Sequence, residues 1–446
     1  MLDNEFHIYR EAKATLVSIV SPKFEFHKDI KETERSMSEL HELLRTLEIE
    51  TGSEHIQNRK TVDPATIIGS GKLKEISEVA KAEKSTLLVF DCELTSSQIR
   101  NIKKISGLSV IDRCHVILEI FAKHARTKEA KLQIEISRLQ YILPRLSGFW
   151  THLGRQRGGV GVMGGEGEQQ IELDRRIIRE RIERFKTELK NLVKSRQEQS
   201  KKRKNKAVTA ALVGYTNAGK SSIMNRLCRV NILEENKLFA TLDSTYRMLN
   251  PDTKPPMILI DTVGFISNLP AMLVEGFKTT LESAIEADLL IIVCDISDPH
   301  MDKHLEVTHK VLNDLGIDEK DHIIVFNKKD LACDELRKKI ILRTHPRSFL
   351  VSSFDEEDIE GLRKYVIEYF LEQQEKYDLF VPYEKGEIHS KVSSNTNIIT
   401  RSTHEKGIYY KIRVPGFIFK NLGLNDYILS PKSELYQKLK DSVLKE

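Results

Sequence analysis

Residues 207–227 read AVTAALVGYTNAGKSSIMNRL, an apolar run that leads into glycines, a lysine and a helix-like stretch. The spacing Gly214-x-x-x-x-Gly219-Lys220-Ser221 is that of a phosphate-binding P-loop, and it falls between a predicted strand and a predicted helix, as the motif requires. Glycines allow backbone N–H groups to close around phosphates at a helix N-terminus, where the helix dipole also favours negative charge. The stretch therefore predicts a nucleotide-binding site.

The residues of this loop have separate expected roles. The Lys220 ammonium would lie against β- and γ-phosphate oxygens, and the Ser221 hydroxyl would bind Mg²⁺. The backbone of the residues between the two glycines would surround the phosphates: Tyr215, Thr216, Asn217 and Ala218.

A second phosphate-proximal element follows about 40 residues later, where the predicted strand 258–260 ends in Asp261-Thr262-Val263-Gly264. The Asp261 carboxylate can hold Mg²⁺ directly or through water, and the Gly264 backbone can contact the γ-phosphate. A DxxG tetrapeptide is common by chance, but its position after a second strand favours the functional interpretation.

The identity of the nucleotide base is predicted by the segment Asn327-Lys328-Lys329-Asp330, which follows the predicted strand 323–326. The Asp330 carboxylate can accept from both N1–H and the 2-amino group of guanine, whereas adenine would leave a buried charge unpaired. The site therefore favours GTP over ATP. Ser352 and Ser353, after the apolar run 349–351, stand where such domains place a backbone amide on guanine O6.

Residues 239–245, FATLDST, lie between the P-loop and DxxG and are a candidate switch I. A threonine hydroxyl here could complete the magnesium shell only while the γ-phosphate is present, and both Thr241 and Thr245 qualify by position. Phe265 directly follows Gly264, where many GTPases carry a glutamine that orients the attacking water. An apolar side chain cannot do this, so we expect slow intrinsic turnover that a partner raises.

Composition bounds the class of protein. A chain of 446 residues exceeds one hydrophobic core, so we expect three or more domains. It is 40% apolar and 30% charged, and it contains no run of about 18 uncharged apolar residues that could span a bilayer. The N-terminus lacks a secretory signal and the five cysteines lack metal or disulfide spacing, so we expect a cytoplasmic location. Peripheral association with a membrane is left open.

The hydrophobic patterns predict an α/β chain with five parts. Two narrow apolar stripes, Leu132 to Leu146 and Ile178 to Leu192, predict a pair of helices joined by a glycine-rich tip. The parts are an N-terminal α/β domain (1–125), a helical hairpin arm (126–200) with its tip at 154–167, a basic linker (201–206), a nucleotide domain with a mostly parallel sheet (207–375) and a small C-terminal α/β domain (376–446).

Positive charge concentrates at the base of the predicted arm. Residues 175–206 hold 14 Lys and Arg against 4 Glu, a net charge of +10, whereas the whole chain carries +4. Such local asymmetry suits contact with a polyanion, although a solvated helix face followed by a linker would carry the same charge, and the arm could also brace the nucleotide domain. The candidates for contact with a polyanion are Arg155, Arg157, Gly158, Gly159, Arg175 and Arg176.

Several segments resemble the HflX family of translation-linked GTPases. Within the nucleotide domain these are TLDST (241–245), with Ser244 in place of the family's proline, DTVGFISNLP (261–270) and ADLLIIVCDISDP (287–299). Outside it they are VIDRCHVILEIFA (110–122), LQYILPRL (139–146) and EGEQQIELDRR (166–176), where Ile171 replaces a leucine and Met163-Gly164 departs from the usual basic residue.

The resemblance implies a monomeric GTPase that uses Mg²⁺ and acts on the large ribosomal subunit, with the arm inserted into ribosomal RNA. In some members of this family, the subunits of stalled ribosomes are split. It also makes Thr241 the favoured switch I ligand, so the predicted catalytic residues are Lys220, Thr241 and Gly264, and the nucleotide contacts extend over Phe239, Ala240, Thr241, Leu242 and Asp243.

Two other functions stay open. A GTP-gated scaffold in ribosome assembly would use hydrolysis only to time its release. A modification enzyme would need an acid/base or metal constellation, which the sequence does not display outside the nucleotide site. Some HflX members show ATP-linked activity in the N-terminal block, but Gly69-Ser70-Gly71-Lys72 lacks P-loop spacing and predicts a turn into a helix.

Overall fold

The computed structural model describes residues 12–24, 27–146, 165–204, 207–229, 239, 244–250, 253–267, 281, 283–332 and 335–429. By its internal contacts the chain divides into two units. The first unit comprises Met1–Val193, Glu235–Asp243 and Val263–Thr280, and the second comprises Lys194–Glu234, Ser244–Thr262 and Leu281–Glu446.

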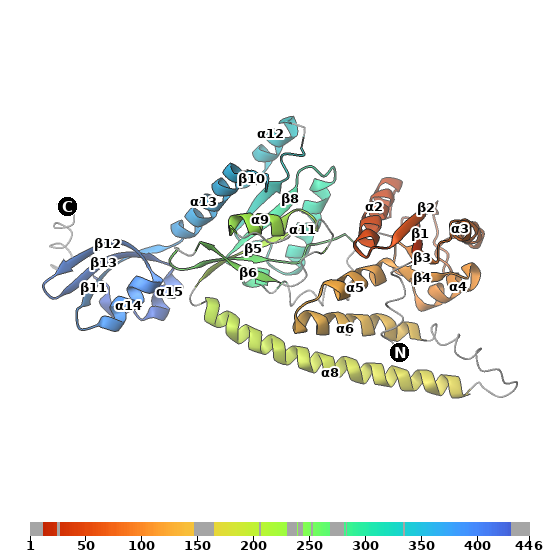
Figure 1. The fold of residues 1–446 in the computed structure, drawn as a ribbon, viewed down its shortest axis with the longest axis horizontal. Helices are drawn as coiled ribbons and strands as arrows, with labels where there is room; N and C mark the ends of the chain where they lie inside the picture. The colour runs from red at the N-terminus through yellow and green to blue at the C-terminus, as the bar shows by residue number, and fades with distance from the viewer. Residues whose placement is uncertain are drawn as a thin grey trace. The chain divides into compact units, whose positions relative to one another are not determined.

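The first unit contains a four-stranded parallel sheet with strand order β2-β1-β3-β4 (Figure 1). β1 and β3 are buried almost throughout, because a parallel sheet is covered on both faces. Its elements are β1 (Lys13–Val20), α2 (Ile30–Thr46), β2 (Glu50–Asn58), α3 (Ser70–Ala82), β3 (Leu87–Phe90), α4 (Ser96–Ser106), β4 (Ser109–Asp112), α5 (Arg113–His124), α6 (Lys128–Ile142) and the 3₁₀ helix η1 (Leu143–Arg145).

Two of the HflX-like segments meet at the buried Asp112. Its carboxylate caps α5 by accepting the backbone N–H of His115 at 2.9 Å. It also accepts from the Tyr141 hydroxyl at 2.8 Å and from the Arg145 guanidinium at 3.4 Å. Burial raises the pKa of the Asp112 carboxyl, and Arg145 opposes the rise. These residues therefore hold α5 and α6 against the sheet, which is a structural role.

α8 (Gly165–Lys204) is a single helix of 40 residues, about 60 Å long at 1.5 Å per residue. An ion pair of 2.6 Å between Lys128 and Glu188 brings the start of α6 beside α8. Ile178 and Ile182 of the predicted stripe are buried. Most of the predicted tip, 154–164, lies outside the described residues.

The second unit contains a six-stranded sheet with order β10-β9-β8-β5-β7-β6. All neighbours run parallel except β6 and β7, so the carboxyl ends of the parallel strands meet at one edge, where ligands bind in such sheets. Its elements are β5 (Val208–Gly214), α9 (Lys220–Leu227), β6 (Thr245–Asn250), β7 (Met257–Asp261), β8 (Leu289–Asp295), α11 (Met301–Asp314), β9 (His322–Asn327), α12 (Glu335–Thr344), β10 (Ser348–Leu350) and α13 (Glu356–Glu372).

A three-stranded antiparallel sheet of order β11-β13-β12 completes the second unit. Alternate residues of β13 face a core that includes Tyr410 and Ile412, because side chains alternate between the faces of a strand. Its elements are β11 (Glu375–Pro382), α14 (Gly386–Asn395), β12 (Asn397–His404), β13 (Gly407–Val414), α15 (Gly416–Leu422) and the 3₁₀ helix η3 (Asn425–Tyr427).

The predicted α/β class and mostly parallel nucleotide sheet are confirmed. Gly69 is followed directly by α3, so the GSGK segment is a turn into a helix, as predicted. The five domain boundaries stay a prediction. Among the described residues, no helix combines the length and apolarity needed to cross a membrane.

Candidate nucleotide site

The two glycines of the P-loop are required by close contacts, with a neighbouring backbone at Gly214 and with a side-chain amide at Gly219. A Cβ on Gly214 would lie 2.2 Å from the Val293 carbonyl oxygen of the neighbouring strand β8, and the residue has φ of +145°. A Cβ on Gly219 would lie 2.2 Å from Asn327 Nδ2, at φ of +91°. Both conformations favour glycine, and α9 starts immediately after Gly219.

Lys220 is buried at the start of α9 and is oriented by the loop itself. Its Nζ donates to the carbonyl oxygens of Gly214 at 3.1 Å and Tyr215 at 2.8 Å. Burial lowers the pKa of Lys220 to about 8, while the Asp261 carboxylate opposes this shift. A lysine ammonium has three donors, so this arrangement leaves a third for phosphate.

Ser221 and Asp261 lie side by side as the sequence predicted from separate motifs. The Ser221 hydroxyl donates to Asp261 Oδ2 at 2.7 Å, and Asp261 is buried at the end of β7. Oxygen donors suit Mg²⁺, which usually takes one or two protein ligands and completes its shell with phosphates and water. These two residues would hold the ion, whose charge would offset that of the β- and γ-phosphates.

No group of three or more His, Cys, Asp or Glu side chains could enclose a metal ion among the residues that the structure describes. The use of Mg²⁺ stays a prediction.

Asn327 joins three predicted elements. Its Nδ2 donates to the Ala218 carbonyl of the P-loop at 3.0 Å, and its Oδ1 accepts the Ser353 backbone N–H at 3.2 Å. The side chain is buried, so these bonds are shielded from water. Asn327 therefore fixes the P-loop relative to the segments that are predicted to recognise the base. The backbone N–H of the neighbouring Ser352 donates to the Asp358 carboxylate at 2.7 Å. Recognition of guanine O6 by this segment stays a prediction.

The rest of the NKKD segment is held by acidic residues that the motif did not include. Lys328 pairs with Asp295 at 2.6 Å, and Lys329 pairs with Asp358 at 2.5 Å. The hydrogen bond that Lys329 donates to the Asp358 carboxylate raises the pKa of Lys329. Asp330 is exposed and has no hydrogen-bond partner among the described residues, which suits an acceptor for a base.

The remaining predicted residues fall in several places. Thr262 donates to the Leu212 carbonyl at 2.7 Å, which ties β7 to β5. The Thr216 hydroxyl and the exposed Asn217, at φ of +60°, belong to the P-loop, and the Thr216 hydroxyl is buried without a hydrogen-bond partner in the described part of the chain. Thr245 begins β6 opposite Asp261.

The switch residues group with the first unit. Val263 and Gly264 belong to it, and Phe265 is buried there at 6% exposure. Phe239 is 2% exposed, and its ring packs on Phe121 of α5 with centroids 4.7 Å apart. Other candidates lie outside the described residues: Ala240, Thr241, Leu242, Asp243, Arg155, Arg157, Gly158 and Gly159.

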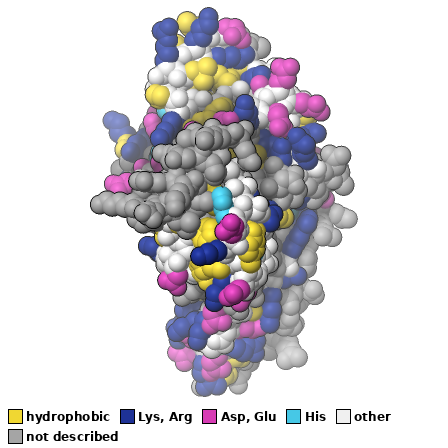
Figure 2. Space-filling view, turned by 90° about the vertical axis from the view of Figure 1, so that its left-hand side faces the viewer, with side chains coloured by type: hydrophobic (Ala, Val, Ile, Leu, Met, Phe, Trp, Pro, Cys, Tyr) yellow, Lys and Arg dark blue, Asp and Glu magenta, His cyan; other side chains and the backbone are white. Residues whose placement is uncertain are grey.

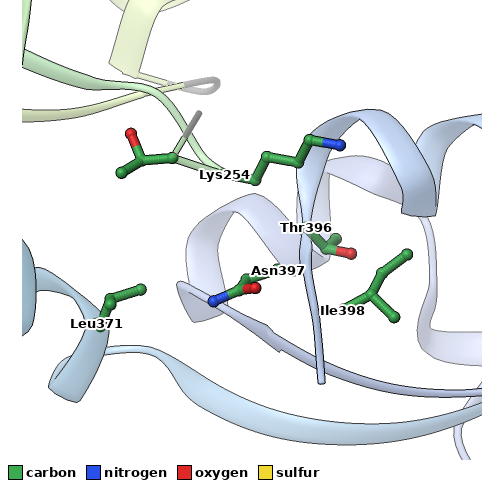
Figure 3. Close-up of a pocket in the computed structure, with 6 residues that line it drawn as sticks. Lys254, Leu371, Thr396, Asn397 and Ile398 are labelled. Atoms are coloured by element: carbon green, nitrogen blue, oxygen red, sulfur yellow. The ribbon is translucent and has the colours of Figure 1, made fainter. Parts of the chain in front are cut away.

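A cavity of about 380 Å³ lies elsewhere in the second unit (Figure 3). Its lining mixes Leu371 and Ile398 with polar side chains such as Asn397. Lys254 reaches across to donate to the Ser393 carbonyl of α14 at 2.6 Å. The cavity includes none of the predicted nucleotide residues, so we assign it no part in the site.

The loop, the Ser221–Asp261 pair and the NKKD segment at the carboxyl edge of a parallel sheet define the class of protein, a P-loop GTPase. A family model described as "50S ribosome-binding GTPase" matches residues 209–328. Models described as "GTP-binding GTPase N-terminal" and "GTP-binding GTPase Middle Region" match residues 34–122 and 124–203.

The similarity to known proteins extends over nearly the full chain. A GTPase HflX of Alkalihalophilus pseudofirmus is 36% identical over 422 residues, which cover 94% of this chain and 95% of that protein. A GTPase HflX of Caldanaerobacter subterraneus subsp. tengcongensis is 39% identical over 403 residues, 90% of this chain and 91% of that one. The chain belongs to the HflX family of GTPases, and it binds and hydrolyses GTP.

Solved structures show more distant likeness. A GTP-binding protein of the archaeon Sulfolobus solfataricus, in complex with GDP, is 24% identical with a TM-score of 0.42, over 80% of this chain and 99% of that chain. Era of Aquifex aeolicus bound to GDP and AlF4⁻ is 21% identical with a TM-score of 0.32, over 37% of this chain and 57% of that chain.

The pKa of Lys220 gives GTP binding an expected pH dependence. The pKa of Lys220 is about 8, so the buried ammonium of the free protein is charged below this pH and loses its proton above it. Bound triphosphate favours the charged form, so binding should take up a proton, and affinity should fall about tenfold between about pH 7 and about pH 9. Calorimetry in two buffers of different ionisation enthalpy measures this uptake.

Guanosine monophosphate is the control for this experiment, because it lacks the β- and γ-phosphate oxygens that we expect Lys220 to contact. Its binding should show no comparable proton uptake. Equal GTP-binding enthalpies in the two buffers at about pH 8 would contradict the assignment of the charge to Lys220.

Proposed function

We propose that this GTPase binds the large ribosomal subunit through α8 and the segment before it, and that it separates the subunits of stalled ribosomes. The observation that carries the proposal is the likeness to GTPase HflX proteins over 94% of the chain. The nucleotide domain matches a model described as a 50S ribosome-binding GTPase, which supports the same partner.

The composition and exposure of α8 support an RNA partner. Arg176 is exposed and Arg175 half-buried near the start of the helix, and the basic excess continues to its end. On the face seen in Figure 2, basic and acidic side chains are interspersed. Clustered arginines displace counterions from phosphates, which makes binding sensitive to salt.

Phe265 supports a need for stimulation by the partner. Its side chain cannot orient a water molecule, and it is buried. We therefore expect slow turnover in isolation and at least about tenfold faster turnover with large subunits, which would position the attacking water. Purified full-length protein with and without large subunits tests this by phosphate release.

Splitting itself is measured by density-gradient sedimentation of intact ribosomes with the protein and a nonhydrolysable GTP analogue. Replacement of residues 158–167 by a flexible Gly-Ser segment should abolish splitting and leave basal turnover unchanged. Loss of association with subunit precursors, without any effect on splitting, would instead favour an assembly scaffold.

A charge reversal separates RNA contact from bracing. Arg176→Glu should weaken subunit binding and lower the salt slope by about 1, whereas Arg343→Glu, an exposed change on α12, should change neither. Unstimulated turnover together with salt-insensitive binding would overturn the ribosomal assignment.

A further inference from the structure

A histidine outside the nucleotide motifs contacts the P-loop. The imidazole of His304, on α11, stacks on the Tyr215 ring with centroids 3.8 Å apart and planes 11° from parallel. Tyr215 is 6% exposed, so the contact lies in the interior. Such aromatic pairs contribute beyond the area that they bury.

His304 is itself held in place by the turn that starts α11. Its Nδ1 lies 3.5 Å from Asp298 Oδ2. The other oxygen of Asp298 accepts the His300 backbone N–H at 2.7 Å. The ring is therefore fixed by a carboxylate on one side and by the Tyr215 face on the other, which restricts its rotation.

The backbone of Tyr215 connects this stack to the phosphate-binding lysine. Lys220 Nζ donates to the Tyr215 carbonyl at 2.8 Å, the shorter of its two bonds to the loop. A rotation of the Tyr215 peptide would move this acceptor. The Tyr215 side chain cannot rotate with its peptide while it stays stacked on His304, because buried rings are closely packed.

We propose that His304 is a positioning residue for the P-loop: through the Tyr215 ring it holds the carbonyl that orients Lys220 before nucleotide binds. The assignment applies to the GTPase reaction and does not depend on the ribosomal partner. A loop ordered in advance loses less conformational freedom on binding. The contribution of His304 is therefore made equally to substrate and transition state, and its loss should raise KM and Kd rather than lower kcat.

The test is a set of variants in the full chain, measured by titration of a fluorescent GDP analogue and by steady-state GTP turnover. His304→Ala should raise the Kd for nucleotide about 3- to 10-fold and KM in parallel, with kcat within about twofold of the wild-type value. His304→Phe keeps a stacking ring and should restore both constants to within about twofold.

His309→Ala is the matched control, because it removes a ring from the same helix where His309 pairs with Asp318 at 2.8 Å, away from the loop. It should leave Kd unchanged. If His304→Ala does not fold, His304→Gln removes the ring while keeping a polar side chain. An unchanged Kd in the ring-deleted variant, or a His304→Phe variant as weak as His304→Ala, would overturn the proposal.

Discussion

Exchange of Asp330 for asparagine should convert the GTP-selective site into one that prefers xanthosine triphosphate. The Asp330 carboxylate is expected to accept from guanine N1–H and from the 2-amino group, whereas the asparagine amide would donate and would face the 2-amino group donor to donor. Xanthine carries a carbonyl oxygen at that position and can accept from the amide. We expect the affinity for GTP to fall at least about 100-fold, because the amide and the 2-amino group are both donors and neither has an acceptor.

Competition titrations with GTP and xanthosine triphosphate measure the exchange. Asp314→Asn, a matched change at an exposed position on α11, should leave GTP binding unaffected. A variant that loses both nucleotides equally would show that Asp330 supports the loop rather than reads the base.

The phosphate-binding part of the site could be predicted from sequence because its geometry is local. Gly214, Gly219, Lys220 and Ser221 lie within eight residues, and the structure requires glycine at both glycine positions through contacts of a hypothetical Cβ at 2.2 Å. The strand before the loop and the helix after it are likewise adjacent in sequence. One short segment therefore carries both the fold signal and the chemistry.

The partners that hold this site together are far apart in the chain and were not predicted. Asp295 pairs with Lys328, and Asp358 pairs with Lys329. His304 lies 89 residues after Tyr215 and has no motif to mark it. Each of these pairs is created by strand order in the sheet, which a single sequence does not specify.

The HflX-like segments outside the nucleotide domain indicated the family, but the sequence did not indicate what their residues do. The structure gives a physical reason for the residues of two segments, because Asp112 accepts hydrogen bonds from Tyr141 and Arg145 in the interior of the first unit. No sequence pattern indicated that these residues contact one another. A signature of this kind can therefore record packing as well as chemistry.

Replacement of Lys220 by methionine should abolish most GTP hydrolysis without destabilising the free protein. Methionine is similar in length to lysine but lacks the charge that we expect to face the β- and γ-phosphates, so kcat/KM should fall about 100-fold or more. Phosphate release under saturating and limiting GTP measures this loss. Lys310→Met, exposed on α11, is the control and should retain activity.

The free Lys220→Met variant should be less active than the wild type but more stable. Burial lowers the pKa of Lys220 from 10.5 to about 8, which corresponds to a cost of about 3 kcal/mol in the folded state at neutral pH. The variant avoids this cost, but it loses two hydrogen bonds to loop carbonyls, which together contribute about 2 kcal/mol. The free variant should therefore unfold a few degrees higher than the wild type.

The sign of the pH dependence gives a further check on this gain. A lysine with a lowered pKa destabilises the folded state below about pH 8, and this cost disappears as the pH rises toward the unfolded value of 10.5. The advantage of the variant in thermal unfolding should be largest near neutral pH and should shrink above about pH 8. A lower unfolding midpoint of the variant at neutral pH would contradict this expectation. It would mean that the hydrogen bonds of Lys220 stabilise the free loop by more than the burial of its charge destabilises it.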